Sequence, residues 1–321
     1  MSDYFDSRAN LQGKVAAVIG GGEGMGRAIV LALLENGVDV YMGDYNDDAM
    51  AITVEEAKKF TAKLVSKHVD VCSREQVKAY WDEFDSHFDH LEILMNVAGG
   101  TWHQEFLNTT PDFWDNQLRR NLMYCIESTY EAGKRMKAGG KGGSIINLTT
   151  IEAYRAAPGF SVYVAAKAGL VGWTRTMSVE FAPYNIRLNC IAPDQTLTPG
   201  GGASTDVYYD PAPSGYVTDP SSPEFEKYMG LIYEQAKCAI PMGRPGYVED
   251  IVKAALFYAS DLSSYITGGT LHVDGGAAAS SGWYMFPEEG FRNRIPAKIV
   301  DTFKDIGEWP TESTGNKSYK G

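Results

Sequence analysis

The sequence predicts an α/β fold in which helices cover a parallel β-sheet. From Lys14 onward, short apolar runs alternate with longer amphipathic segments, as in chains that repeat a strand and a helix. A cluster of glycines directly follows the first apolar run and allows the tight turn between the first strand and the first helix. The hydrophobic share of 44% and the charged share of 22% are ordinary for a globular protein.

Each element is expected where the apolar period and the boundary residues agree. Thr110 and Pro111 predict the start of one long helix, and Pro183 predicts the end of another. Strands are expected at Val15–Gly20, Val38–Gly43, Lys63–Val69, Leu91–Met95, Ser144–Leu148, Ile186–Ile191 and Thr270–Val273. Helices are expected at Gly26–Asn36, Asp47–Phe60, Ser73–His87, Pro111–Lys137, Ser161–Ala182 and Val248–Ser260.

A long segment after the sixth strand breaks this alternation. Asp194–Pro223 is rich in Pro, Gly, Ser and Thr, yet it carries Tyr208 and Tyr209. A loop of this length in a compact domain is usually functional or disordered, and the tyrosines favour a lid. We therefore expect residues 194–240 to form a lid inserted into a single domain of residues 1–276.

Residues 277–321 are expected to form a C-terminal extension. Its apolar residues are spaced for one face of a helix that begins near Pro296, and Trp283 and Tyr284 precede that helix. Most of the extension is therefore predicted to pack on the domain or on a neighbouring subunit.

Charge and cysteine content argue against several classes of protein. Lys and Arg total 29 against 41 Asp and Glu, so the net charge of −12 argues against nucleic acid or an anionic membrane as a partner. The four cysteines lack metal-ligand spacing, which predicts reduced thiols and no metal site. The N-terminus lacks an apolar signal core and no apolar run is long enough to span a bilayer, so we expect a soluble, cytoplasmic protein.

The glycine cluster from Gly20 to Gly26 predicts a nucleotide site. It follows a predicted strand and opens a predicted helix, which is where backbone N–H groups bind a pyrophosphate. Gly20, Gly24 and Gly26 have the spacing GxxxGxG. Arg27 and Ala28 stand where a phosphate-binding NTPase loop needs Lys and Ser or Thr, so that class of site is excluded.

Asp44 predicts which dinucleotide the turn binds. It ends the second strand, eighteen residues after Gly26, where a carboxylate accepts hydrogen bonds from the adenosine ribose and repels a 2′-phosphate. Glu23 adds a second negative charge, so NAD is favoured over NADP. Asp70, which ends the third strand, is a candidate contact for the adenine amino group.

A tyrosine and a lysine indicate the chemistry. Tyr163 and Lys167 stand four residues apart, and Thr150 stands thirteen residues before the tyrosine. Two other Tyr–Lys pairs have this spacing, but neither has a hydroxyl donor thirteen residues earlier. A lysine one helical turn away, together with the positive nicotinamide ring, is expected to lower the pKa of Tyr163 from its usual value near 10 toward the working range. The triplet predicts proton transfer coupled to alcohol oxidation or carbonyl reduction.

From Leu11 to Gly276 the chain resembles the short-chain dehydrogenase/reductase family. The resemblance implies a Rossmann-type, doubly wound, seven-stranded parallel sheet with helices on both faces. It also implies a homo-oligomer, commonly a homotetramer or a dimer, paired through the two longest helices. Besides the motifs above, it is carried by Asn96–Gly99, Asn121, Ser144–Thr150, Ile186–Pro193, Pro241–Arg244 and Gly268–Gly276.

The same resemblance assigns roles to individual residues. It implies that Tyr163 is the general acid/base, that Lys167 binds the nicotinamide ribose, and that Asn121 belongs to a water-linked proton relay. Thr150 stands where the family usually has a serine and is expected to orient the substrate oxygen, with Thr149 as an alternative. The implied cofactor, NAD, would be held by Tyr163 and Lys167 and by Gly20, Gly22, Glu23, Gly24, Met25, Gly26, Asp44, Asp70, Val71, Asn96, Ala98, Gly99, Pro193 and Thr198.

Residues beyond the fourth, fifth and sixth strands are candidates for a substrate pocket. His103 invites a catalytic role, although a lining or exposed histidine is the plainer interpretation, and Glu152 is as typical of a surface loop as of a pocket. The candidate walls are Thr101, Trp102, His103, Glu152, Tyr154, Gln195, Tyr208 and Tyr209.

We therefore predict an NAD(H)-dependent oxidoreductase that interconverts a secondary alcohol and its ketone. The aromatic lid and extension favour a bulky, mostly apolar small molecule of the steroid, terpenoid or aryl alcohol type. A 3-oxoacyl thioester reductase is the alternative, disfavoured because such reductases usually take NADPH. A catalytically weak NAD-binding sensor of the same fold is a further alternative.

Overall fold

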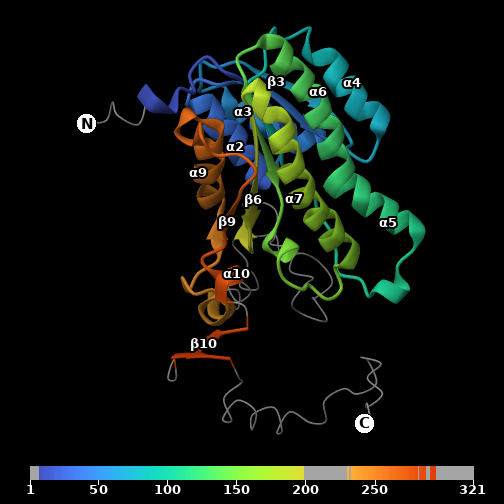
Figure 1. The fold of residues 1–321 in the computed structure, drawn as a ribbon, viewed down its shortest axis with the longest axis vertical. Helices are drawn as coiled ribbons and strands as arrows, with labels where there is room; N and C mark the ends of the chain where they lie inside the picture. Colours follow the sequence, from blue (N-terminus) through green and yellow to red (C-terminus); the bar gives the residue numbers. More distant parts are fainter. Residues whose placement is uncertain (1–6, 199–229, 231–232, 281, 287–289, 294–321) are drawn as a thin grey trace.

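Seven parallel strands form the sheet at the centre of the structure (Figure 1). The computed structural model describes residues 7–198, 230, 233–280, 282–286 and 290–293. The strands are β1 (Val15–Ile19), β2 (Asp39–Asp44), β3 (Leu64–His68), β4 (Ile93–Asn96), β5 (Gly143–Leu148), β6 (Ile186–Pro193) and β9 (Thr270–Val273). Their order is β3-β2-β1-β4-β5-β6-β9, which reverses between β1 and β4 and confirms the predicted doubly wound sheet.

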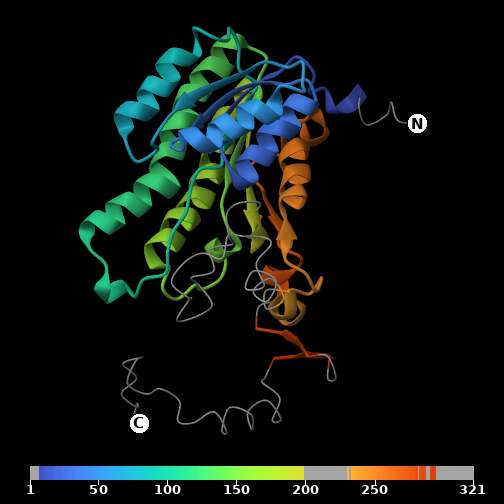
Figure 2. The same cartoon turned by 180° about the vertical axis from the view of Figure 1, so that it is seen from behind.

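Different helices cover the two faces of the sheet (Figures 1 and 2). The main helices are α2 (Gly24–Glu35), α3 (Asp47–Ala57), α4 (Arg74–Phe84), α6 (Tyr124–Gly139), α7 (Ser161–Phe181) and α9 (Val248–Ala259). Because side chains alternate along a strand, Ala16 and Val18 of β1 pack under α2, α3 and α9. Ala17 and Ile19 of the same strand pack under α4, α6 and α7. Each face of the sheet thus has its own apolar core.

The long helix predicted over Pro111–Lys137 is confirmed, but its geometry is not α throughout. The segment is divided into α5 (Pro111–Leu118), a π-helical turn η2 (Arg119–Met123) and α6. Thr110 caps α5 by accepting the N–H of Phe113, as expected. Within the π turn, the Asn121 side chain donates to the carbonyl of Gln117 at 3.1 Å, so it is part of the local deviation from α geometry.

The region between β6 and β9 contains further short elements. β7 (Thr196–Leu197) pairs in parallel with β8 (Gly246–Tyr247), and residues 233–239 are helical. Short 3-10 turns occur at η1 (Phe106–Asn108), η3 (Ile151–Ala153), η4 (Ala182–Tyr184) and η6 (Asp261–Ser263). Most of the predicted lid, including Tyr208 and Tyr209, lies outside the described residues.

The chain beyond Gly276 begins with α10 (Ala277–Ser280) and a hairpin of β10 (Tyr284–Phe286) and β11 (Gly290–Arg292). The sequence pattern did not predict this hairpin. Trp283 is 49% exposed and Tyr284 is 47% exposed, so they do not bury their rings on the described part of the chain. The predicted helix near Pro296 lies outside the described residues. Among those that are described, no helix is long and apolar enough to cross a membrane.

Candidate active site

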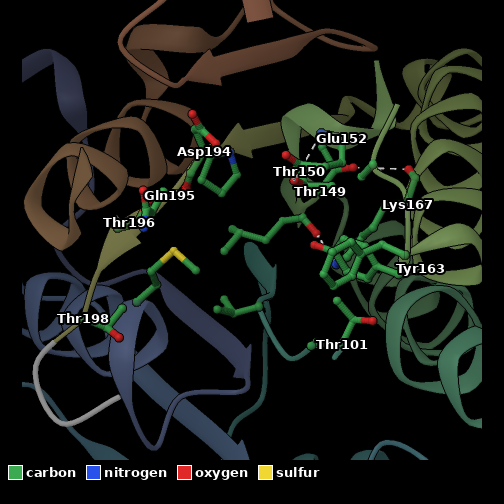
Figure 3. A pocket seen from close by; sticks show the side chains of 18 residues that line it. Thr101, Thr149, Thr150, Glu152, Tyr163, Lys167, Asp194, Gln195, Thr196 and Thr198 are labelled. Atoms are coloured by element: carbon green, nitrogen blue, oxygen red, sulfur yellow. Dashed lines mark hydrogen bonds between the residues drawn. The ribbon is translucent and has the colours of Figure 1, made fainter. Parts of the chain in front are cut away.

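A cavity of about 440 Å³ lies where β4, β5 and β6 end. Open α/β sheets bind ligands at the carboxyl ends of their strands, near the point where the strand order reverses. Met25 of α2 and two residues of α7, Tyr163 and Lys167, complete the wall. Figure 3 shows one group of lining residues, Thr149, Thr150, Glu152, Tyr163 and Lys167, facing a second group, Asp194, Gln195, Thr196 and Thr198.

Several glycines between β1 and the first turn of α2 have no room for a side chain, Gly20 and Gly26 among them. Gly20 has a φ of 90°, a conformation that favours glycine. A β-carbon added to Gly26 would lie 1.7 Å from the carbonyl oxygen of Gly20. Met25, in the first turn of α2, lines the cavity, so the N-terminal end of this helix borders it. This is the arrangement that binds a pyrophosphate group.

Asp44, at the end of β2, is held against the same turn. Its carboxylate accepts the N–H of Gly22 at 2.9 Å and the N–H of Asn46 at 3.0 Å. A β-carbon on Gly22 would lie 2.9 Å from Cγ of Asp44, so only glycine permits this contact without displacement. The side chain is buried, with 6% of its surface exposed. The glycine turn and Asp44 therefore fit an adenine dinucleotide.

The other predicted nucleotide contacts are divided between the cavity and its surroundings. Thr198 lines the cavity, and its Cγ2 lies 3.4 Å from the place of a β-carbon on Gly24. Asp70 accepts the N–H of Cys72 at 2.9 Å. Asn96 donates to Asn147 at 2.8 Å, and its Oδ1 is buried without a hydrogen-bond partner in the described structure. Of the remainder, Gly99 and Pro193 line the cavity, whereas Glu23, Val71 and Ala98 do not.

Tyr163 and Lys167 lie one turn apart on α7 and both border the cavity. Lys167 is 3% exposed and donates from Nζ to the carbonyl of Leu148 at 2.8 Å. The same Nζ lies 5.9 Å from the centroid of the Tyr163 ring. Lys167 therefore has a backbone partner in addition to the tyrosine.

In the protein alone, the pKa of Tyr163 is raised rather than lowered, and the lowering expected from Lys167 together with the nicotinamide ring stays a prediction. Burial raises the pKa of Tyr163 well above its usual value, and the negative charge of Glu152 raises it further. A hydrogen bond with Thr150 opposes these two effects. Burial also lowers the pKa of Lys167, which weakens the influence of its charge. The protein alone thus favours the protonated phenol.

Asn121 connects the π turn to the cavity wall. Its Oδ1 accepts the N–H of Gly100 at 3.1 Å, and its Nδ2 donates to the carbonyl of Gly100 at 3.0 Å. A β-carbon on Gly99 would lie 3.0 Å from Oδ1 of Asn121 and 3.2 Å from Nζ of Lys167. The absence of a side chain at Gly99 thus lets the asparagine and the lysine approach the same point.

The hydroxyl groups of Thr149 and Thr150 have different partners. Thr149 donates to the carbonyl of Lys167 at 3.2 Å, so its hydroxyl supports α7. Thr150 forms hydrogen bonds with Glu152 and Tyr163. This difference favours Thr150 over Thr149 as the hydroxyl that faces the substrate.

Comparison with known proteins shows the family of the chain. The family model described as short chain dehydrogenase matches residues 14–206. The chain belongs to the short-chain dehydrogenase/reductase family. A second model, described as Enoyl-(Acyl carrier protein) reductase, matches residues 213–278.

Relatives within the short-chain dehydrogenase/reductase family differ in their named substrates. The chain is 34% identical to a 3-oxoacyl-[acyl-carrier-protein] reductase of Chlamydia trachomatis, over 84% of this chain and 98% of the relative. It is 30% identical to an NAD-dependent glycerol dehydrogenase of Listeria innocua, over 85% and 96%. Carveol dehydrogenase from Mycobacterium avium, solved in complex with NAD, superposes with a TM-score of 0.74 at 26% identity, over 84% and 99%.

An ionic network that the sequence did not reveal borders the catalytic side of this short-chain dehydrogenase/reductase. Arg155 donates from Nη2 to Oε1 of Glu152 at 2.8 Å and to Oδ1 of Asp194 at 3.2 Å. Burial raises the pKa of Asp194, and the charge of Arg155 opposes that rise. Glu152 and Asp194 are 42 positions apart, so no spacing rule would have linked them through Arg155.

Three candidate walls are not part of the cavity. The Trp102 ring packs on Phe113 with centroids 5.4 Å apart, and Trp102 is 44% exposed. The imidazole of His103 packs on Phe160, which itself lines the cavity. Tyr154 points to β9, where its hydroxyl donates to Thr270 at 2.7 Å. Thr101, Glu152 and Gln195 do line the cavity, as does Thr149. The lining also includes the unpredicted Val97, Gly100, Leu148, Ala157, Phe160, Asp194 and Thr196.

Proposed function

We propose that the chain is an NAD(H)-dependent oxidoreductase that interconverts a secondary alcohol and its ketone. One observation carries this proposal. The hydroxyl groups of Thr150 and Tyr163 and the amine of Lys167 meet at one cavity, which also borders the glycine turn through Met25. A substrate oxygen can therefore contact two hydroxyl groups while its carbon faces the nucleotide side.

Each side chain has a distinct task in this proposal. Tyr163 transfers the proton to or from the substrate oxygen, and Thr150 orients that oxygen. Lys167, fixed by the Leu148 carbonyl, places positive charge beside Tyr163 and is available to the ribose. Asn121 positions Gly100 and borders Lys167, where a water molecule can join the two side chains. The bound nucleotide supplies or accepts the hydride.

We propose NAD rather than NADP as the nucleotide. The buried Asp44 carboxylate presents negative charge beside the turn, where a 2′-phosphate would be repelled. The glycerol dehydrogenase is named as NAD-dependent, and the carveol dehydrogenase was solved with NAD. Both properties support the assignment.

Among substrates, the relatives favour a 3-oxoacyl thioester. The Chlamydia trachomatis protein carries this activity in its name, as do relatives from Thermotoga maritima and Aquifex aeolicus. The expectation of a bulky apolar substrate depended on the aromatic lid and extension; Tyr208 and Tyr209 of the lid lie outside the described residues, and Trp283 and Tyr284 of the extension are about half exposed. The structural similarity to carveol dehydrogenase supports a terpenoid alcohol as the second candidate substrate.

A direct assay tests the proposal. The purified chain is mixed with NAD or NADP and with 3-hydroxybutyryl thioester, carveol, a hydroxysteroid, glycerol or cyclohexanol, and the absorbance of the reduced nucleotide is followed. We expect turnover with NAD, fastest with the thioester. Tight NAD binding without turnover of any alcohol, or of the matching ketones with NADH, would instead favour a sensor.

We also propose that the chain forms a homo-oligomer through its α6 and α7 surfaces. Tyr130 on α6 is 63% exposed and Val179 on α7 is 73% exposed, which leaves apolar surface on the two helices. Light scattering after size exclusion should give a dimer or tetramer mass, and charged substitutions at both positions should reduce it. A monomer mass for the wild type would reject this assembly.

A further inference from the structure

Phe160 is a wall of the cavity for which the proposed mechanism has no task. Among the described residues that line the cavity, only Phe160 and Tyr163 are aromatic. Phe160 directly precedes α7, three residues before Tyr163, and it is 8% exposed. Its apolar ring is therefore available to contact the part of the substrate that does not react.

The main chain holds Phe160 from both sides. Its N–H donates to the carbonyl of Ala157 at 3.1 Å, and its carbonyl accepts the N–H of Val164 at 2.9 Å. Ala157 is a second apolar residue of the same loop that lines the cavity. Because the backbone is fixed in this way, the position of the ring depends on the side chains that pack behind it.

His103 supports the Phe160 ring from outside the cavity. The two rings meet edge to face with centroids 5.5 Å apart, and His103 itself does not line the cavity. The backbone N–H of Gln104 donates to the carbonyl of Gly159 at 2.9 Å, which joins the loop after β4 to the loop before α7. A β-carbon on Gly159 would lie 2.2 Å from two atoms of the imidazole, so the imidazole packs directly on this second loop.

The cavity leaves little room for the unreactive part of a substrate. Its volume is about 440 Å³, and ligand cavities commonly range from about 300 to 1,000 Å³. Lys167, the expected contact of the nicotinamide ribose, lines the same cavity, so the nucleotide takes part of this volume. A long alkyl group would then collide with the Phe160 ring, and overpacking against a fixed side chain is unfavourable.

We propose that Phe160 is a specificity-determining residue that restricts the alkyl group of the substrate to a few carbons, and that His103 is a positioning residue that holds the Phe160 ring against the cavity. This inference rests on the proposed function, in which the substrate oxygen binds at Thr150 and Tyr163. It goes further because it selects among the candidate substrates. A four-carbon 3-hydroxyacyl thioester fits this restriction, whereas a long-chain thioester or a terpenoid alcohol does not.

The experiment measures how each variant ranks a short and a long substrate. With NAD, kcat/KM is determined for 3-hydroxybutyryl and 3-hydroxyoctanoyl thioesters and for 2-butanol and 2-octanol, and the ratio of the short to the long substrate is taken within each pair. We expect the wild type to favour the short substrate. Phe160→Ala should lower this ratio by about 10- to 100-fold, and Phe160→Leu, which keeps more of the apolar side chain, should lower it less.

Variants of His103 separate support of the ring from general damage. His103→Ala should lower the same ratio by about 2- to 10-fold, because an aromatic contact is lost while Phe160 remains. His103→Phe keeps a ring in this place and should retain the wild-type ratio. Phe106→Ala is the matched control and should leave the ratio unchanged, because Phe106 stacks on Trp114, is 52% exposed and does not line the cavity.

The outcomes separate this inference from the proposed function. A wild type that oxidises the long substrates as efficiently as the short ones overturns the size restriction, as does an unchanged ratio in both Phe160 variants or an equal shift in Phe106→Ala. An unchanged ratio in His103→Ala overturns the role of His103. Oxidation of glycerol alone also overturns the inference, because glycerol has no alkyl group to restrict. If no alcohol is oxidised and no matching ketone is reduced, the proposed function itself is rejected.

Discussion

The nucleotide side and the catalytic side of the cavity are built in different ways. On the nucleotide side, glycines determine the path of the backbone, because a β-carbon on Gly26 would collide with the Gly20 carbonyl. On the catalytic side, hydrogen bonds between side chains decide it, as at Thr150 and Glu152. The fit of the glycine turn depends on a few neighbouring residues, whereas a network of side-chain hydrogen bonds depends on each residue that takes part in it. The catalytic side should therefore respond to changes of single polar atoms.

Among the substitutions that test this difference between the two sides, Tyr163→Phe should have the largest effect on activity. It removes the proton-transfer group while keeping the ring, so kcat should fall by about 10²- to 10⁴-fold with NAD affinity almost unchanged. Steady-state rates and NADH fluorescence titration measure the two properties. Tyr130→Phe is the matched control, because Tyr130 also precedes a lysine by four residues but is 63% exposed on α6. A similar loss in both variants would contradict the assignment of Tyr163.

Thr150→Ala comes next and should lower kcat by about 10- to 100-fold, because the substrate oxygen loses one of two contacts. Thr150→Ser keeps the hydroxyl and should stay within a few fold of wild type. Thr149→Ala removes the bond to the Lys167 carbonyl and should cost about 1 kcal/mol of unfolding free energy with little change in kcat. Wild-type rates in Thr150→Ala would show that another group orients the substrate.

Gly26→Ala tests the nucleotide side. Because a β-carbon would lie 1.7 Å from the Gly20 carbonyl, we expect a loss of about 1–3 kcal/mol of stability and weaker NAD binding. Gly172→Ala is the control, since nothing lies within 4 Å of its β-carbon position in α7. That variant should gain up to about 1 kcal/mol through helix propensity. Thermal unfolding compares the two variants, and equal melting temperatures would show that a β-carbon at Gly26 can be accommodated.

Asp44→Asn should have the smallest effect. The amide oxygen can still accept one N–H from the turn, but the charge that repels a 2′-phosphate is removed. We expect the ratio of kcat/KM with NAD to that with NADP to fall by about 10-fold. Val40→Ala, in the same strand but in the apolar core, should reduce stability and leave that ratio unchanged. An unchanged ratio in Asp44→Asn would show that another residue determines the preference for NAD over NADP.

The sequence by itself determined the order of strands and helices, the glycine turn and the tyrosine–lysine pair. These features are local, since each depends on residues within one turn or one strand–helix unit. The same locality explains why Tyr163 and Lys167 border the cavity as expected. It also explains the correct cap of α5 by Thr110.

Only the tertiary structure decided which polar groups meet around these motifs. The side chain of Asn121, in the π turn, contacts Gly100 beyond β4. The hydroxyl of Tyr154 contacts Thr270 of β9. Arg155 links Glu152 to Asp194, which follows β6. The pKa of Tyr163 is of the same kind, because it is raised by burial and by the charge of Glu152, which only the folded chain brings to the tyrosine. Desolvation and hydrogen bonds between distant residues depend on how the chain packs, so the spacing of residues in the sequence could not predict them.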